Sequence, residues 1–188
     1  MDLEQAIRSR RAVRAFSPEP VERATLVRLI DAAIQAPSAV NEQPWSFTVV
    51  EDQSVLTRIS TESKAHMLAT ASGEIAAHQL VQRLRDPSFH IFYHAPALIV
   101  ISSVNADLWA IENCSLAAEN LMLAACAEGL GSCWIGFAQG WLASAPGKAA
   151  LGIPPEYLPV APIIVGHPQG SVPAVPRRAP EIRWIPPG

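Results

Sequence analysis

The sequence has few charged residues and no long apolar run. Of its 188 residues, 16% are charged and 49% are hydrophobic, a composition that suits one compact domain with a substantial core. No apolar run approaches the ~18 residues that a membrane-spanning helix needs. The first residues, MDLEQAIRSRR, lack the apolar core of a signal peptide. We therefore expect a cytoplasmic protein of one domain, residues 1–188, with no membrane partner.

Basic residues are too scattered for a nucleic-acid-binding surface. The net charge is −3, and the arginines gather only between Arg8 and Arg14 and at Arg177-Arg178. Nucleic-acid binding needs a broader basic face, so we expect no nucleic-acid partner. Arg10, Arg11 and Arg14 admit two interpretations. They are either a solvated basic turn or a clamp for an anion, because a guanidinium matches phosphate oxygens and keeps its charge at any relevant pH.

Cysteine is scarce, and its odd count does not suit a disulfide framework. Cys114 and Cys126 fall on a strongly apolar predicted helix, and Cys133 follows that helix closely. We expect reduced thiols packed in the core, without a role in turnover.

Several motifs of common nucleotide-binding and catalytic sites are missing. No G-x-G-x-x-G follows a strand, G-x-S-x-G is absent, and Leu142 stands where a P-loop ending at Lys148 would need its first glycine. His90 and His94 are four residues apart, but no glutamate follows His90 as in a zinc-protease helix. We therefore expect no metal site.

The most informative stretch runs from Glu112 to Phe137. Its first part is apolar except for a narrow polar stripe, and Leu121 to Ala127 contains no polar residue, which predicts a buried helix. Gly129 and Gly131 then predict the end of the helix, and residues 132–136 a short strand.

Periodicity and turn residues predict the other elements. We expect helices near 2–9, 21–35, 52–60 and 141–151, and strands over 46–50, 95–101 and 160–165. The segment Thr61–Pro87 is weakly patterned and predicts one or two helices. From Pro154 onward the chain holds ten of its seventeen prolines, which indicates an extended arm. Because the arm also carries Trp184, we expect it to dock, for example on another subunit.

Four stretches in this order resemble the FMN-dependent nitroreductase family. They are residues 10–16 (RRAVRAF), 36–45 (APSAVNEQPW), 128–136 (EGLGSCWIG) and the tail from Gly166-His167-Pro168 to Glu181. The resemblance implies an α+β fold with a mostly antiparallel sheet flanked by helices, in an intertwined homodimer that holds FMN at each subunit interface. It also implies that the arm, residues 168–188, adds a strand to the sheet of the partner.

The resemblance further implies which residues bind the flavin. Arg10 and Arg178 would grip the phosphate, Arg14 would approach the N1–C2=O edge, and Gly129 would bring backbone N–H groups to N5 and O4. Ser38 and Asn41 would come from the partner subunit. No side chain acts as a catalytic acid or base. The implied cofactor-binding residues are Arg10, Arg11, Ala12, Arg14, Pro37, Ser38, Ala39, Asn41, Gln43, Glu128, Gly129, Leu130, Gly131, Arg177 and Arg178.

By resemblance the activity is a ping-pong reaction. NADH or NADPH would reduce the flavin, which would then reduce a nitroaromatic, a quinone or a related acceptor. Two alternatives stay open: a specialised relative, such as a reductive dehalogenase or a flavin-destroying ligand synthase, and a non-catalytic flavin-binding sensor or carrier. Many relatives have serine where this chain has Ala12 and Ala39, so two hydroxyl contacts to the flavin are missing.

Overall fold

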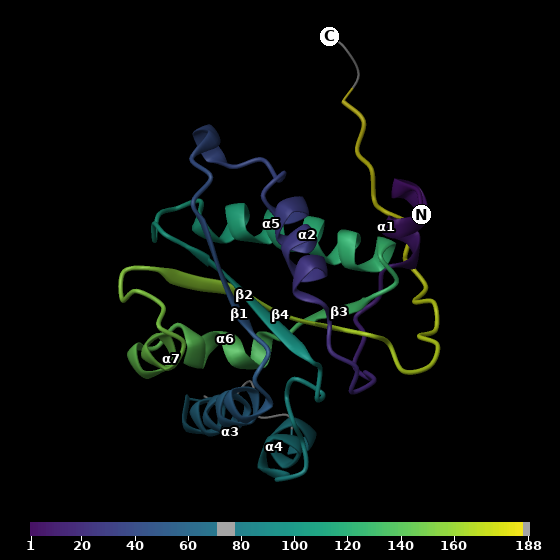
Figure 1. Ribbon diagram of the computed structural model, residues 1–188. Helices are drawn as coiled ribbons and strands as arrows, with labels where there is room; N and C mark the ends of the chain where they lie inside the picture. The colour runs from purple at the N-terminus through teal and green to yellow at the C-terminus, as the bar shows by residue number, and fades with distance from the viewer. Residues whose placement is uncertain (71–77, 186–188) are drawn as a thin grey trace.

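The chain forms a mixed α+β domain (Figure 1). The computed structural model describes residues 1–70 and 78–185. The helices of this part are α1 (Leu3–Ser9), α2 (Arg23–Ala33), α3 (Gln53–Thr70), α4 (His78–Arg85), α5 (Ala110–Ala127), α6 (Gly136–Leu142), α7 (Ala145–Ala150) and the 3₁₀ helix η1 (Ala39–Asn41). The strands are β1 (Trp45–Val50), β2 (Ala97–Ser103), β3 (Gly131–Trp134) and β4 (Leu158–Gly166).

One four-stranded sheet organises the domain. Its order is β1-β2-β4-β3, and every neighbouring pair is antiparallel, which confirms the fold class predicted from the sequence. All seven residues of β2 are buried, because helices cover both faces. Ala97, Ile99 and Ile101 face the core formed with α2 and α5. Leu98 and Val100 alternate to the other core, formed with α3 and α6.

The apolar helix predicted at the centre of the chain is α5, and it runs directly into β3 as expected. Its side toward the sheet is buried, with Cys114, Leu121 and Ala125 fully covered. Its other side is open in the single chain, where Ile111 and Leu116 are exposed. The prediction of a buried helix therefore holds for the sheet-facing side only.

Two predicted helix boundaries were wrong. The helix that Asp52 caps does not end near Ser60 but continues to Thr70, because no glycine or proline interrupts it. The single helix predicted over residues 141–151 is two helices. The second, α7, starts afresh where Ser144 accepts a hydrogen bond from Gly147 N at 3.2 Å and Pro146 occupies the first turn. Part of the weakly patterned segment, residues 71–77, lies outside the described residues.

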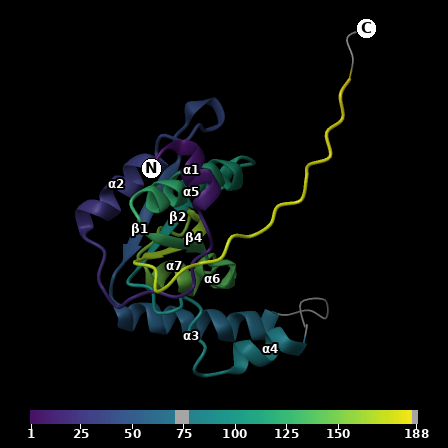
Figure 2. The same cartoon turned by 90° about the vertical axis from the view of Figure 1, so that its right-hand side faces the viewer.

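The segment after β4 leaves the body of the molecule (Figure 2). Residues 171–185 have no regular secondary structure and are exposed, as the dense prolines predicted. Trp184 and Ile185 are 84% and 89% exposed, so this end of the arm is not packed against the described part of its own chain. In the described part of the chain, no helix is long and apolar enough to cross a membrane.

Candidate functional site

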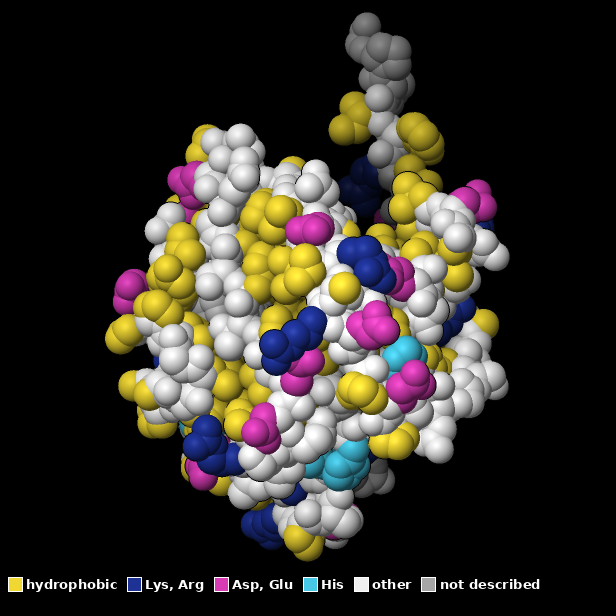
Figure 3. All heavy atoms as spheres, viewed as in Figure 1, with side chains coloured by type: hydrophobic (Ala, Val, Ile, Leu, Met, Phe, Trp, Pro, Cys, Tyr) yellow, Lys and Arg dark blue, Asp and Glu magenta, His cyan; other side chains and the backbone are white. Residues whose placement is uncertain are grey.

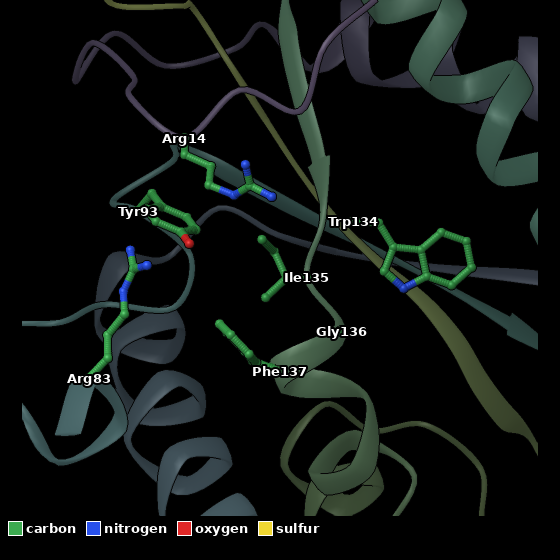
Figure 4. A pocket seen from close by; sticks show the side chains of 7 residues that line it. All are labelled: Arg14, Arg83, Tyr93, Trp134, Ile135, Gly136 and Phe137. Carbon is green, nitrogen blue, oxygen red and sulfur yellow. The ribbon is translucent and has the colours of Figure 1, made fainter. Parts of the chain in front are cut away.

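A pocket of about 380 Å³ opens beside the C-terminal end of β3 (Figure 4). We call it the Arg14 pocket. Four separate segments contribute to it: the chain after α1, helix α4, the turn before β2, and the connection from β3 to α6. Its lining residues are Arg14, Arg83, Tyr93, Trp134, Ile135, Gly136 and Phe137.

Arg14 reaches this pocket because the segment after α1 runs alongside β3. Ala12 forms a parallel bridge with Ser132, and Val13 N donates to Ser132 O at 3.0 Å. The Arg14 guanidinium then lies 6.0 Å from the centre of the Tyr93 ring, within the range of a cation–π contact. Tyr93 has a positive φ of 52°, a strained conformation for a non-glycine residue in the turn that presents its ring.

The connection from β3 to α6 brings backbone to the pocket. Ile135 N donates to Pro162 O at 2.8 Å, which fixes the turn. Gly136 and Phe137 begin α6, and N–H groups in the first turn of a helix have no intrahelical acceptor. A Cβ built on Gly136 would meet nothing within 4 Å. Packing among the described residues therefore does not explain the glycine.

A second pocket of about 240 Å³ lies at the other end of the same segment. We call it the Arg10 pocket. The end of α5 and the first residues after β4 complete its wall. Its lining residues are Ser9, Arg10, Arg11, Val13, Cys126, Gly129, Leu130, Ser132, Pro168, Gly170 and Val172.

The two arginines of the Arg10 pocket are only partly satisfied. Arg10 Nη2 donates to Glu119 Oε1 at 3.1 Å, and Arg11 Nη1 donates to two backbone oxygens, of Arg8 and Arg10, at 2.6 and 2.8 Å. The Nε atoms of Arg10 and Arg11 are buried and have no partner in the described part of the chain. A buried donor without an acceptor is costly. Both arginines line the pocket, so an anion bound there could supply the missing acceptors.

The glycines and glutamate predicted to contact the flavin have structural explanations within the chain. Gly129 follows the end of α5 with a φ of 79°, a conformation that favours glycine there. A Cβ on Gly131 would lie 2.7 Å from side-chain atoms of Val13. Glu128 accepts from Arg28 Nε at 3.1 Å, which ties α5 to α2. Leu130 is buried. The flavin contacts of these residues remain predictions.

The predicted flavin loop, Pro37–Gln43, lies away from both pockets. With Trp109, Asn113 and Leu116 it lines an apolar hollow of about 430 Å³ beside α5. Three loop residues, Val40, Asn41 and Gln43, have positive φ angles. Side chains hold this conformation: Ala39 N donates to Asn113 Oδ1 at 2.9 Å, and Gln43 N donates to Ser38 Oγ at 2.9 Å.

One chain thus assembles part of the predicted site. Arg10, Arg11 and the glycine turn share one pocket, and Arg14 occupies the next. The loop with Ser38 and Asn41 lies elsewhere, and Arg177 and Arg178 lie on the exposed arm and line neither pocket.

Sequence reasoning did not assign a role to Arg83, Tyr93, Gly136 or Phe137, which line the Arg14 pocket. The cluster of aromatic residues from Phe89 to Tyr93 was the available signal for part of this wall. Arg83 gave no such signal, because it lies in the weakly patterned segment.

A sequence model described as the nitroreductase family matches residues 7–167 of the chain. Among solved structures, the chain is similar to a nitroreductase with bound FMN from Bacteroides fragilis, at 25% identity and a TM-score of 0.86, over 98% of this chain and 99% of that one. It is also similar to iodotyrosine deiodinase bound to FMN and 3-iodo-L-tyrosine, at 25% identity and a TM-score of 0.76, over 97% and 98% of the two chains.

A curated relative from Archaeoglobus fulgidus is named as a candidate NADH dehydrogenase/NAD(P)H nitroreductase. It is 31% identical over 112 residues, which cover 59% of this chain. The match spans 53% of the length of that relative.

Proposed function

Since the chain belongs to the nitroreductase family, we propose that it is an FMN-dependent oxidoreductase. It takes reducing equivalents from NADH or NADPH and passes them to a nitroaromatic, a quinone or a related acceptor in a ping-pong reaction. The FMN-bound neighbours and the name of the archaeal relative support this assignment.

The observation that carries the proposal is the pair of unsatisfied guanidinium Nε atoms in the Arg10 pocket. FMN ends in a phosphate dianion, and charged N–H donors in a partly buried pocket are the chemistry that such a group requires. The residues present therefore fit the cofactor. Arg10 and Arg11 would hold the phosphate, and Ala12 next to them would contribute backbone only.

The Arg14 pocket fits the other end of the cofactor. The flavin ring of bound FMN supplies reversible hydride transfer at N5. Arg14 would place a fixed positive charge at the ring edge where reduction adds negative charge. The glycine at 136 would let a flat ring approach the backbone closely. Tyr93 and Phe137 would keep water from one side of the ring.

A second copy of the chain completes the proposed site. Ser38 and Asn41 are held in a defined loop beside α5, and Arg177 and Arg178 lie in the exposed, irregular part of the arm, residues 171–185. We propose that each subunit of a homodimer lends this loop to the flavin of its partner, and that Arg178 joins Arg10 at the phosphate.

The test is to reduce the purified protein anaerobically while its flavin absorbance is recorded. We expect one FMN per subunit, bleaching by NADH or NADPH, and recovery of the oxidised spectrum on addition of a nitroaromatic or a quinone. A protein that binds no added FMN contradicts the proposal. Slow bleaching by both nicotinamides would instead indicate a flavin-binding sensor or carrier.

Reductive dehalogenation is a second candidate, favoured by the full-length similarity to iodotyrosine deiodinase. The measurement that separates the candidates is reoxidation of the dithionite-reduced protein by 3-iodo-L-tyrosine, with release of iodide. Rapid iodide release and no reaction with nitroaromatics would favour the dehalogenase.

A further inference from the structure

We propose that Arg83 binds an anionic group on the electron acceptor, so that the site favours aromatic acceptors that carry a carboxylate. This inference rests on the proposed function, because it concerns the substrate of that same site. It makes Arg83 a specificity-determining residue outside the flavin-binding set.

The first argument is the charge of the pocket. Arg14 and Arg83 both line it, they come from different elements (Figure 4), and no aspartate or glutamate is among the lining residues that the structure describes. Two guanidinium groups facing one cavity repel each other unless an anion lies between or beside them. The described lining of the pocket therefore carries positive charge without a neighbouring carboxylate.

The second argument is how Arg83 is held. Its guanidinium carbon lies 4.4 Å from the centre of the Phe89 ring, so the group is stacked on an aromatic face. Stacking orients the guanidinium and leaves its N–H edge free to donate. Within the residues that the structure describes, Arg83 has no carboxylate partner, whereas Arg23 and Arg28 pair with Glu51 and Glu128.

The third argument concerns the remaining wall. Tyr93 and Phe137 give the pocket aromatic surfaces, against which a flat ring can pack. An aromatic ring with a charged substituent satisfies both kinds of surface at once. The flavin phosphate is a poor candidate for Arg83, because the Arg10 pocket lies at the far end of the segment and already offers two buried donors.

The test compares two acceptors that differ in charge, 4-nitrobenzoate and 4-nitrobenzamide, in the FMN-loaded wild type and in Arg83→Gln. The kcat/KM of each is measured at saturating NADH or NADPH. The intrinsic reactivity of each acceptor cancels when its ratio is compared between variants. We expect the benzoate-to-benzamide ratio to fall about tenfold in Arg83→Gln, through KM of the benzoate, as expected for loss of one charged hydrogen bond. Arg83→Lys should restore part of the ratio.

Arg85→Gln is the matched control. Arg85 lies on the same helix and is exposed, but it does not line the pocket. Its replacement by glutamine removes the same charge as Arg83→Gln. It should leave the ratio as in the wild type. A ratio that falls equally in both variants would mean general electrostatic attraction, and would overturn the assignment to Arg83.

Three further results would overturn the proposal: an unchanged ratio in Arg83→Gln, equal losses for both acceptors together with a shifted flavin midpoint potential, and a loss confined to NADH or NADPH. The last would give the anion site to the electron donor. Failure of the proposed function would look different, as a wild type that reduces neither acceptor. In that case calorimetry with benzoate and benzamide, which needs no turnover, still tests Arg83. Arg83→Gln should weaken the binding of benzoate about tenfold. Equal affinity of the wild type and the variant for benzoate would reject the site.

Discussion

At the scale of single residues, Arg10 and Arg14 show how one short segment can serve two purposes. Arg10 lies before the bridge between Ala12 and Ser132, and Arg14 lies after it. The two arginines nevertheless line different pockets. Arg10 shares its pocket with the buried Nε of Arg11, and Arg14 faces aromatic side chains. The two arginines should therefore be separable by mutation.

Arg10→Ala should weaken FMN binding about ten- to a hundredfold, because a hydrogen bond to a charged group contributes ~1.5–3 kcal/mol. Riboflavin lacks the phosphate, so its affinity should hardly change. The measurement is the dissociation constant of each flavin by fluorescence quenching. Equal losses for FMN and riboflavin would show that Arg10 has a structural role, for example through its contact with Glu119. Arg14→Ala serves as the comparison, and it should instead lower the midpoint potential of bound FMN.

Gly131 and Gly136 should respond differently to an added side chain. Gly131→Ala places a methyl group against Val13 and should lower the free energy of unfolding by about 1–3 kcal/mol, as overpacking does. Gly136→Ala adds a Cβ that meets no described neighbour within 4 Å, so stability of the flavin-free protein should not fall, while FMN affinity should. Chemical unfolding and flavin titration of both variants check this. Normal FMN binding by Gly136→Ala would place the flavin elsewhere.

Cys114 should be inert in the native state. Burial, with a smaller contribution from Asp107, raises the pKa of its thiol from an ordinary value of 9.0 to about 12. The unfolded chain therefore loses this proton first, and stability should decline as pH rises from about 9 toward 12. Urea unfolding should show that the free energy of unfolding falls more between pH 8 and pH 10.5 in the wild type than in Cys114→Ala. An equal fall in both proteins would contradict a raised pKa of Cys114. Turnover should persist in Cys114→Ala, because the flavin carries the electrons.

At the scale of elements, α5 positions the loop that carries Ser38 and Asn41. Asn113 is buried on this helix, and its Oδ1 accepts from Ala39 N while its backbone oxygen accepts from Trp45 Nε1 at 2.9 Å. The loop keeps three positive φ angles, which need such support.

Asn113→Ala should release the loop. Loss of the Oδ1 acceptor should destabilise the fold by roughly 1 kcal/mol, toward the lower end of the usual range because the unsatisfied Nδ2 is removed as well. FMN affinity should fall, and hydrogen exchange at the Ala39 amide should accelerate. Asn120→Ala is the control, since Asn120 Nδ2 donates to Ala32 O and not to the loop. Identical exchange at Ala39 in both variants would reject the positioning role.

At the scale of the whole molecule, the single chain leaves apolar surface uncovered. Hydrophobic side chains are grouped over the region of α2 and α5 in Figure 3. On α5, Ile111 and Leu116 are exposed, and so are Trp109 just before this helix and Trp184 on the arm. Exposed apolar side chains that are grouped in this way are typical of an interface.

We expect a homodimer that depends on the arm. Deleting residues 180–188 should lower FMN occupancy and the melting temperature together, because the arm removes apolar area from water on both subunits. Sedimentation, flavin absorbance and thermal unfolding of the full chain and the truncated chain check this. A monomer that retains one FMN per subunit would contradict both the dimer and the shared site.

The sequence allowed much of the fold to be predicted, and less of the site. The four strands were predicted, and so was the direct succession of helix α5 and strand β3. Alternation of apolar and polar residues and helical periodicity both act over a few neighbouring residues. The length of α3 and the division into α6 and α7 were missed. A weak apolar pattern hid the first, and the capping of Ser144 decided the second.

What the sequence by itself determined was the family, the arginine segment 10–14 and the glycine turn after α5, since each is written in consecutive residues. Tertiary structure decided which side chains share a cavity. It brought Arg83 and Tyr93 to Arg14, and it separated Arg14 from the Arg10 pocket. It also showed that Gly131 serves packing against Val13, whereas Gly136 is free of such contact. The physical reason is that contacts between distant residues follow from how the helices and the sheet pack, which no local pattern records.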